Sequence, residues 1–389
     1  MIEVSTEMLE DSCMRAAGLF SGIGGFEAGL AQSGITTDVM CENWEPAARV
    51  LQRRFDSNVF GDIRGLRALP RCDVVTAGFP CTDLSQVGRT AGIDGDESGL
   101  IREVFRLITK RGPRWLVLEN VPNLLALHHG AAIRFIVQWL EDHRWNWAYR
   151  TVDSQYFGVR QRRRRTYLVA SRTEDPRTVL FADNAALAPV RPTHRAYGFY
   201  WTEGNRGLGW GEGVTPTLKG GSKLGIASPP GVWLHERSVG DAIVKPSIAA
   251  GERLQGFPSG WTDAVSREGE RWKLVGNAVT VPVAEWIGRR LVDPGKSVEV
   301  ERRPFDHRKS WPKAAANVGG GREAWTLSER PMKIAPQASL AAVLEKYGAV
   351  PLSIGATTGF ATRLKASRLQ SRAGFIQALD AHINACQKA

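Results

Sequence analysis

Short apolar runs alternate with stretches of helical periodicity between Arg15 and Arg172. The run from Asp73 to Phe79 is almost continuously apolar, which is typical of a strand buried on both faces of a parallel sheet. The pattern predicts strands near residues 15–20, 38–42, 73–79, 115–120, 145–153 and 166–171, and helices near residues 24–32, 44–54, 98–110 and 131–140. Such alternation indicates an α/β fold with a doubly wound sheet.

The alternation breaks after residue 172. Residues 173 to about 250 scatter Pro, Gly and Trp, which predicts a small irregular second domain. Apolar residues return to helical spacing from Val281 to Leu291, and this helix is expected to complete the first domain. Residues from about 296 onward form an extension with helical patterns near 338–347 and 373–385. No chemistry is visible there, so we expect a packing or DNA-backbone role.

The composition of the chain indicates the class of its partner and the cellular compartment in which it works. Lys and Arg outnumber Asp and Glu by 51 to 40, and the formal charge of +11 favours a polyanionic partner. The five cysteines have neither an even framework nor the paired spacing of a zinc site, so we expect a reducing compartment and no metal. No apolar stretch approaches 18 residues and no signal-peptide pattern is present. These features predict a cytoplasmic protein with a polyanionic partner and without membrane contact.

Cys81 is the first candidate for chemistry. It follows the buried run that ends at Phe79, and Pro80 before it stiffens the turn. In open α/β sheets ligands bind at the carboxyl ends of the strands, so a thiol there is a candidate nucleophile. A lone intracellular cysteine is more often a small buried hydrophobe, and the choice therefore depends on the other motifs.

Three further runs supply groups that an attack on a pyrimidine ring needs. A glycine-rich loop, residues 17–26, follows a strand and opens a helix, as a nucleotide-binding loop does. A second buried strand ends in an acid, Glu119. Five arginines lie within the six residues 160–165.

Together these runs resemble the DNA (cytosine-5-)methyltransferase family of the bacterial restriction-modification type. The resemblance covers roughly residues 15 to 295 and follows the family's motif order. The matching motifs are Phe20-Ser-Gly-Ile-Gly-Gly25, Glu42 with Trp44, Gly61-Asp62-Ile63, Phe79-Pro80-Cys81, Glu119-Asn120-Val121, Gln161-Arg-Arg-Arg-Arg165, Arg253-Leu-Gln-Gly-Phe-Pro258 and Gly276-Asn277-Ala-Val279.

The resemblance implies a mechanism. Carbon 5 of cytosine is a poor nucleophile, and Cys81 would activate the ring by adding to carbon 6. Glu119 would hold ring nitrogen 3, and Arg165 would hold the carbonyl oxygen. Arg163 is expected to point inward beside Arg165 as a second catalytic arginine. The final base for carbon 5 is not visible in the sequence, and water is the conservative choice.

The resemblance also implies a cofactor, S-adenosylmethionine. In the family's pattern Glu42 takes the ribose hydroxyls and Trp44 stacks on the adenine. The full set of cofactor-binding residues expected here is Phe20, Gly22, Gly24, Glu42, Trp44, Asp62, Ile63, Pro80, Asn277 and Val279.

The expected DNA contacts follow from the need to flip the target base out of the duplex. Ser85, Gln86 and Arg89, after Cys81, would enter the gap or touch phosphate. Gln161 is also assigned to DNA. The remaining arginines of the basic run are available to phosphate: Arg160, Arg162 and Arg164.

The implied organisation has a discontinuous, Rossmann-like S-adenosylmethionine-dependent catalytic domain at residues 15–172 plus 276–295. Residues 173–275 would form the target-recognition domain, and residues 296–389 a C-terminal extension. The expected partner is double-stranded DNA, with a cognate restriction endonuclease unless the enzyme is an orphan. The chain is expected to be a monomer.

Two departures and two rivals stay open. Arg160 replaces the family's usual Pro, and Ala249-Ala250 stand where many members have Arg-Glu. A transfer-RNA cytosine methyltransferase would carry Cys-Phe-Thr soon after the Glu-Asn-Val motif, where this chain has Pro122-Asn-Leu-Leu125. A catalytically inactive DNA-binding homologue would be expected to lose Cys81, Glu119 or the cofactor glycines.

Overall fold

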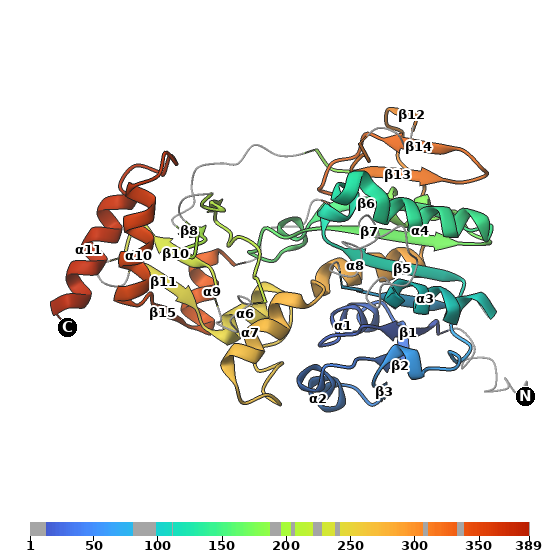
Figure 1. Cartoon of the computed structure of the whole chain (residues 1–389), viewed down its shortest axis with the longest axis horizontal. Helices are drawn as coiled ribbons and strands as arrows, with labels where there is room; N and C mark the ends of the chain where they lie inside the picture. Colours follow the sequence, from blue (N-terminus) through green and yellow to red (C-terminus); the bar gives the residue numbers. More distant parts are fainter. Residues whose placement is uncertain are drawn as a thin grey trace, which may run out of the picture. The chain divides into compact units, whose positions relative to one another are not determined.

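The computed structural model describes residues 13–80, 99–110, 112–186, 196–203, 207–220, 228–237, 242–305, 310–332 and 338–388. The chain divides into two compact units, each of which gathers segments that are far apart in the sequence (Figure 1). The first unit comprises Met1–Val152, Arg165–Ala185 and Val283–Pro331, and the second comprises Asp153–Arg164, Ala186–Pro282 and Met332–Ala389. Within the described ranges, no helix is long and apolar enough to cross a membrane.

The first unit is built on a ten-stranded mixed sheet. Its strands are β1 Arg15–Leu19, β2 Thr36–Cys41, β3 Asn58–Phe60, β4 Val74–Ala77, β5 Trp115–Asn120, β6 Asn146–Asp153, β7 Arg164–Ser171, β12 Arg302–Pro304, β13 Ala314–Asn317 and β14 Arg322–Trp325. They lie in the order β12-β14-β13-β6-β7-β5-β4-β1-β2-β3. Strands β1 to β5 pair in parallel, whereas β7 runs antiparallel to β5. The carboxyl ends of the parallel strands therefore meet at one edge, where the start of β7 joins them.

Helices complete the first unit. They are α1 Gly25–Ala31, α2 Glu45–Arg54, α3 Gly99–Lys110, α4 Ala131–Asp142, α5 Arg177–Leu180 and α8 Val281–Val292. Buried residues of α3 and α4, such as Val104 and Ile133, share one core with Val75 and Leu116 of the sheet. Burial of this continuous apolar surface is the main stabilising term that the fold offers.

The α/β fold class expected from the sequence is confirmed. Each strand and helix expected between Arg15 and Arg172 is present, with its ends shifted by a few residues. Strand β3 was not predicted, because its three residues carry no apolar run. Strands β12 to β14 also escaped prediction. Ala314–Asn317 has no alternating pattern, and its pairing with β6 joins segments that are distant in the sequence.

The second unit contains an antiparallel sheet where the sequence predicted irregular structure. Its strands are β8 Ala196–Phe199, β9 Gly211–Glu212, β10 Gly231–Leu234, β11 Ile243–Pro246 and β15 Ala349–Pro351, in the order β15-β11-β10-β8-β9. Its helices are α6 Ile248–Leu254, α7 Glu268–Asn277, α9 Leu340–Tyr347, α10 Ile354–Lys365 and α11 Phe375–Lys388. The strands have only two to four residues, too few for periodicity to distinguish them from loops.

Residues after 296 do not form a unit of their own. Val283–Pro331 belongs to the first unit and Met332–Ala389 to the second. In the second unit the ring centroid of Phe199 lies 5.1 Å from that of Phe360 and 5.0 Å from that of Phe375. Helices α10 and α11 thus cover the apolar side chains of a sheet encoded more than a hundred residues earlier. The unit bounds differ from the three expected ranges for this reason, and the functional roles of those ranges stay predictions.

Candidate active site

The turn between β1 and α1 has the backbone geometry of a ligand-binding loop. Phe20, Gly22 and Gly24 all have positive φ, at 55°, 58° and 84°. A side chain at Gly24 would also collide with the ring of Phe55, whereas Gly22 has open space around it. Gly22 is therefore required for its backbone conformation, which positions its N–H group.

Glu42 lies directly after β2 and faces this turn. Its carboxylate accepts hydrogen bonds from the N–H of Gly22 at 2.9 Å and from the N–H of Trp44 at 2.7 Å. Burial raises the pKa of Glu42, and these backbone donors oppose that rise. The orientation of the carboxylate is thus fixed by N–H groups of the two segments that follow β1 and β2, which are neighbours in the sheet.

A pocket at the same edge brings together four of the expected cofactor residues: Phe20, Glu42, Asp62 and Ile63. Asp62 is largely exposed, with one carboxylate oxygen capping the turn at Arg64, 2.9 Å from its N–H. Trp44 caps the start of α2 with its backbone and is not among the described lining residues. The pocket thus combines an aromatic ring, two acids and an aliphatic side chain.

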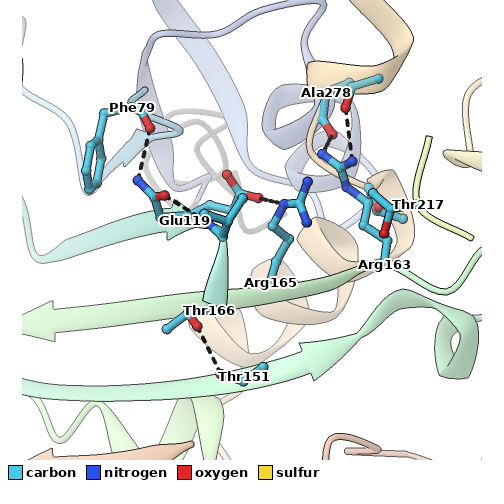
Figure 2. A network of polar contacts seen from close by, with 12 residues as sticks. Phe79, Glu119, Thr151, Arg163, Arg165, Thr166, Thr217 and Ala278 are labelled. Carbon is cyan, nitrogen blue, oxygen red and sulfur yellow. Dashed lines mark hydrogen bonds and ion pairs between the residues drawn. The ribbon is translucent and has the colours of Figure 1, made fainter. Parts of the chain in front are cut away.

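A second set of polar groups lies where β5 ends beside the start of β7. Arg165 Nε lies 3.0 Å from Glu119 Oε1, and both side chains are mostly buried (Figure 2). The two strands pair antiparallel, with Glu119 opposite Tyr167, so the sheet itself brings the acid and the arginine together. A buried carboxyl whose position is fixed by an arginine suits a polar ring that carries both a donor and an acceptor.

The neighbouring Asn120 fixes the end of β4. Its amide donates to the carbonyl oxygen of Phe79 at 3.0 Å, and its own carbonyl accepts from the N–H of Val121 at 2.8 Å. Phe79 is buried and Pro80 is exposed. The sequence assigned no role to Asn120, although it stands within the Glu-Asn-Val motif. It anchors the chain at the point where the backbone leads toward Cys81.

Arg163 and Arg165 belong to different units. Arg163 is 2% exposed, and its guanidinium donates to the carbonyls of Gly276 at 3.0 Å and Ala278 at 2.8 Å (Figure 2). Both carbonyls lie at the end of α7, where helix carbonyls lack internal partners. Sequence reasoning expected a catalytic arginine here. The contacts are those of a residue that holds the segment around Asn277.

Gln161, which the sequence assigned to DNA, is fully buried. Its amide nitrogen donates to Leu254 O at 3.0 Å and to Gln255 Oε1 at 3.1 Å, and its oxygen accepts from Leu218 N–H at 2.7 Å. Gln255 in turn donates to Val275 O at 2.8 Å. The side chain of Gln161 has no surface left for DNA, because it joins three segments of the second unit.

Gln161→Ala is therefore expected to lower the free energy of unfolding by roughly 3 kcal/mol, since it leaves buried backbone groups without partners. Urea denaturation measures this loss, with Gln52→Ala on the exposed side of α2 as the control. A folded variant of unchanged stability that had lost only DNA affinity would instead favour the direct DNA contact.

The remaining expected site residues are less defined. Asn277 and Val279 lie in the second unit, Asn277 exposed and Val279 buried, and their approach to a cofactor stays a prediction. Cys81, Ser85, Gln86 and Arg89 lie outside the described residues.

Comparisons with known proteins identify the family of this chain. The C-5 cytosine-specific DNA methylase model matches residues 14–194 and 247–293. The chain is 44% identical over 326 residues to the type II methyltransferase M2.BsuMI of Bacillus subtilis (strain 168), covering 79% of this chain and 82% of the relative. It is 29% identical over 297 residues to the type II methyltransferase M.NgoBI of Neisseria gonorrhoeae, covering 69% of this chain and 89% of that relative.

Solved structures bear on the fold alone. The S. pombe Dnmt2 methyltransferase superposes with a TM-score of 0.54 at 15% identity, covering 72% of this chain and 97% of that one. The Entamoeba histolytica methyltransferase EhMeth gives 0.52 at 15% identity, with 72% and 98% covered. Since the family model spans more than half of the sequence and a relative matches at 44% identity across most of it, the chain belongs to the C-5 cytosine-specific DNA methylase family.

Proposed function

We propose that this DNA cytosine methyltransferase moves a methyl group from S-adenosylmethionine to carbon 5 of a flipped-out cytosine, through a covalent bond between Cys81 and the ring. The observation that carries the proposal is the Glu119–Arg165 pair, 3.0 Å apart at the sheet edge where the chain runs toward Cys81. A carboxyl and a guanidinium fixed side by side match ring nitrogen 3 and the neighbouring carbonyl oxygen of cytosine.

The described residues fit the proposed cofactor. Glu42, held by the N–H groups of Gly22 and Trp44, directs its carboxylate to the pocket, where it would accept hydrogen bonds from ribose hydroxyls. Phe20 and Ile63 line the same pocket with apolar surface that suits an adenine ring. When bound, S-adenosylmethionine supplies a methyl group on a sulfonium, which is an electrophilic carbon. Trp44, Asn277 and Val279 would complete the site.

The proposed steps involve groups of this chain, the cytosine ring, the methyl donor and water. The Cys81 thiolate adds to carbon 6, and the electron pair of the ring double bond shifts toward nitrogen 3 and the carbonyl oxygen. Glu119 shares a proton with nitrogen 3, while Arg165 stabilises charge on the oxygen. Bound S-adenosylmethionine would supply the methyl group to carbon 5, with its methyl–sulfur bond breaking and the sulfur keeping the electron pair. Loss of the carbon 5 proton to water and expulsion of the Cys81 thiolate restore the aromatic ring.

Other residues would position these groups. Arg163 holds the segment around Asn277 through two backbone carbonyls, which supports a positioning role in place of the expected catalytic one. Arg160 and Arg162 already donate to Ala338 O at 2.8 Å and Gly209 O at 3.0 Å. The side chain of Arg164 is 54% exposed, and we propose it for a phosphate contact.

The proposed substrate is double-stranded DNA, read by the second unit, with Ser85, Gln86 or Arg89 acting at the gap that the flipped base leaves. The enzyme would work as a cytoplasmic, DNA-associated monomer. It would protect sites against a cognate restriction endonuclease or act as an orphan. Membership of a DNA methylase family favours DNA over transfer RNA.

The test is methyl transfer by the purified protein from radiolabelled S-adenosylmethionine to plasmid DNA and, in parallel, to bulk transfer RNA. Digestion to nucleosides and chromatography identify the product. We expect label in 5-methyldeoxycytidine and none in the RNA. Label in RNA alone would favour the transfer-RNA rival, and DNA binding without cofactor binding would favour the inactive homologue.

A further inference from the structure

Glu27, on the first turn of α1, is a buried acid that the mechanism above does not use. The residue is 2% exposed, and its carboxyl oxygens have no hydrogen-bond partner of good geometry among the described residues, although its own backbone N–H and the Ser21 hydroxyl lie nearby. No lysine, arginine or histidine of the described ranges forms an ion pair with it. Burying a carboxyl without a good hydrogen-bond partner costs folding free energy, and such a group in a folded protein has a physical reason.

The position of this carboxyl is specific. Glu27 Oε1 occupies the space that a side chain on Gly18 would need, and the Ser21 hydroxyl lies against the same point. That hydroxyl is also buried and has no hydrogen-bond partner of good geometry. Two buried polar groups, each without a partner of good geometry elsewhere, thus converge directly behind the turn that carries Phe20 and Gly22. The front of this turn borders the pocket of Glu42 and Asp62.

The charge of this group is finely balanced. Burial is the main cause that raises the pKa of Glu27 to about 7; its own backbone N–H and the Ser21 hydroxyl oppose the rise, and the nearby charge of Glu42 adds a smaller upward contribution. Near neutral pH the carboxyl is therefore divided between its protonated and ionised forms. A positive charge arriving at the turn would favour the ionised form through the low-dielectric interior.

The proposed cofactor brings such a charge. S-adenosylmethionine is positive at its sulfonium and α-ammonium and negative at its α-carboxylate, so the half of the molecule that extends beyond the ribose has a net positive charge. We infer that Glu27 is a buried counter-charge for this methionyl end, acting from behind the glycine turn, and that cofactor binding releases a proton from its carboxyl to solvent. The inference rests on the proposed function and makes Glu27 a positioning residue, because it acts through the turn.

The test compares the wild type with Glu27→Gln, which keeps the shape and removes the charge. Calorimetric titration at pH 7 in two buffers of different ionisation enthalpy measures protons released on binding. The two ligands are S-adenosylmethionine and 5′-methylthioadenosine, which lacks both positive charges. We expect the wild type to release about half a proton with S-adenosylmethionine, and the variant to release almost none. The variant should lose roughly tenfold in affinity for S-adenosylmethionine and nothing for 5′-methylthioadenosine.

If Glu27→Gln folds poorly, a second variant and the pH dependence of thermal stability still test the inference. Gly18→Ala retains the acid but drives a methyl group into the space of Oε1, and it should reproduce the ligand-selective loss. Because the folded pKa of about 7 lies above the ordinary value of 4.5 for a glutamate, Glu27 stabilises the ligand-free protein at low pH. That contribution is lost as pH rises from about 4.5 to 7, and Glu27→Gln should remove this slope from the melting profile.

The outcomes separate the two proposals. Equal proton release by the wild type and Glu27→Gln, or an equal loss of affinity for both ligands, would overturn the counter-charge and leave Glu27 a structural residue. A wild type that methylates DNA but shows no proton release would do the same without harming the proposed function. A wild type that binds neither ligand would overturn the proposed function itself.

Discussion

Cys81→Ala is expected to reduce methyl transfer to DNA by at least about 10⁴-fold, because no other group can form the bond to carbon 6 that activates the ring. Affinity for S-adenosylmethionine should stay within about twofold of the wild-type value, since the expected cofactor groups lie on other strand ends. Single-turnover transfer of a labelled methyl group to DNA measures the first effect, and calorimetric titration measures the second.

Cys72→Ala is the matched control for this substitution. Burial raises the pKa of the Cys72 thiol to about 11, so this cysteine is protonated and unreactive at neutral pH. The control should transfer methyl groups at the wild-type rate. If Cys81→Ala retained more than a few per cent of the wild-type rate, covalent catalysis through Cys81 would have to be abandoned.

Glu119→Gln is expected to slow the single-turnover rate by roughly 10²- to 10⁴-fold, the usual contribution of a positioned acid–base group. The amide keeps the shape of the side chain, but it cannot share a proton with nitrogen 3 and no longer pairs with the charge of Arg165. The effect should fall on the chemical step, so affinity for the cofactor should hardly change.

A control substitution at a surface acid tests whether the loss of any negative charge has the same effect. Glu45→Gln removes a carboxylate that is 70% exposed on α2 and pairs with Arg49, one turn along the same helix. Its rate should equal that of the wild type. A Glu119→Gln rate within threefold of the wild type would mean that Glu119 takes no part in proton sharing.

The sequence predicted the sheet edge well, because the groups that define it are local. A buried apolar run locates a strand, and the next residue in the chain, such as Glu42 or Glu119, then lies at its carboxyl end. The antiparallel pairing of β5 with β7 was needed to place Arg165 against Glu119. That pairing depends on the whole sheet and carries no local signal.

Other contacts could not be predicted from the residues one at a time, because they form only in the tertiary fold. The basic run around Gln161 is typical of a solvated surface, yet the structure buries Gln161 and Arg163 on carbonyls that lie 93 to 115 residues away in the sequence. Glu27 is an acid in a helix, ordinarily a sign of exposure, and only packing against Gly18 makes it a buried group. The aromatic contacts between Phe199 and Phe375 likewise follow from tertiary folding.

Bisulfite sequencing tests whether this chain methylates cytosine in DNA through Cys81. The plasmid DNA comes from a methylation-free bacterial host that expresses either the wild type or Cys81→Ala. We expect protected cytosines at one short recurring sequence with the wild type and none with the variant. Equal protection with both proteins, or no protection despite soluble wild-type protein that binds S-adenosylmethionine, would contradict this expectation.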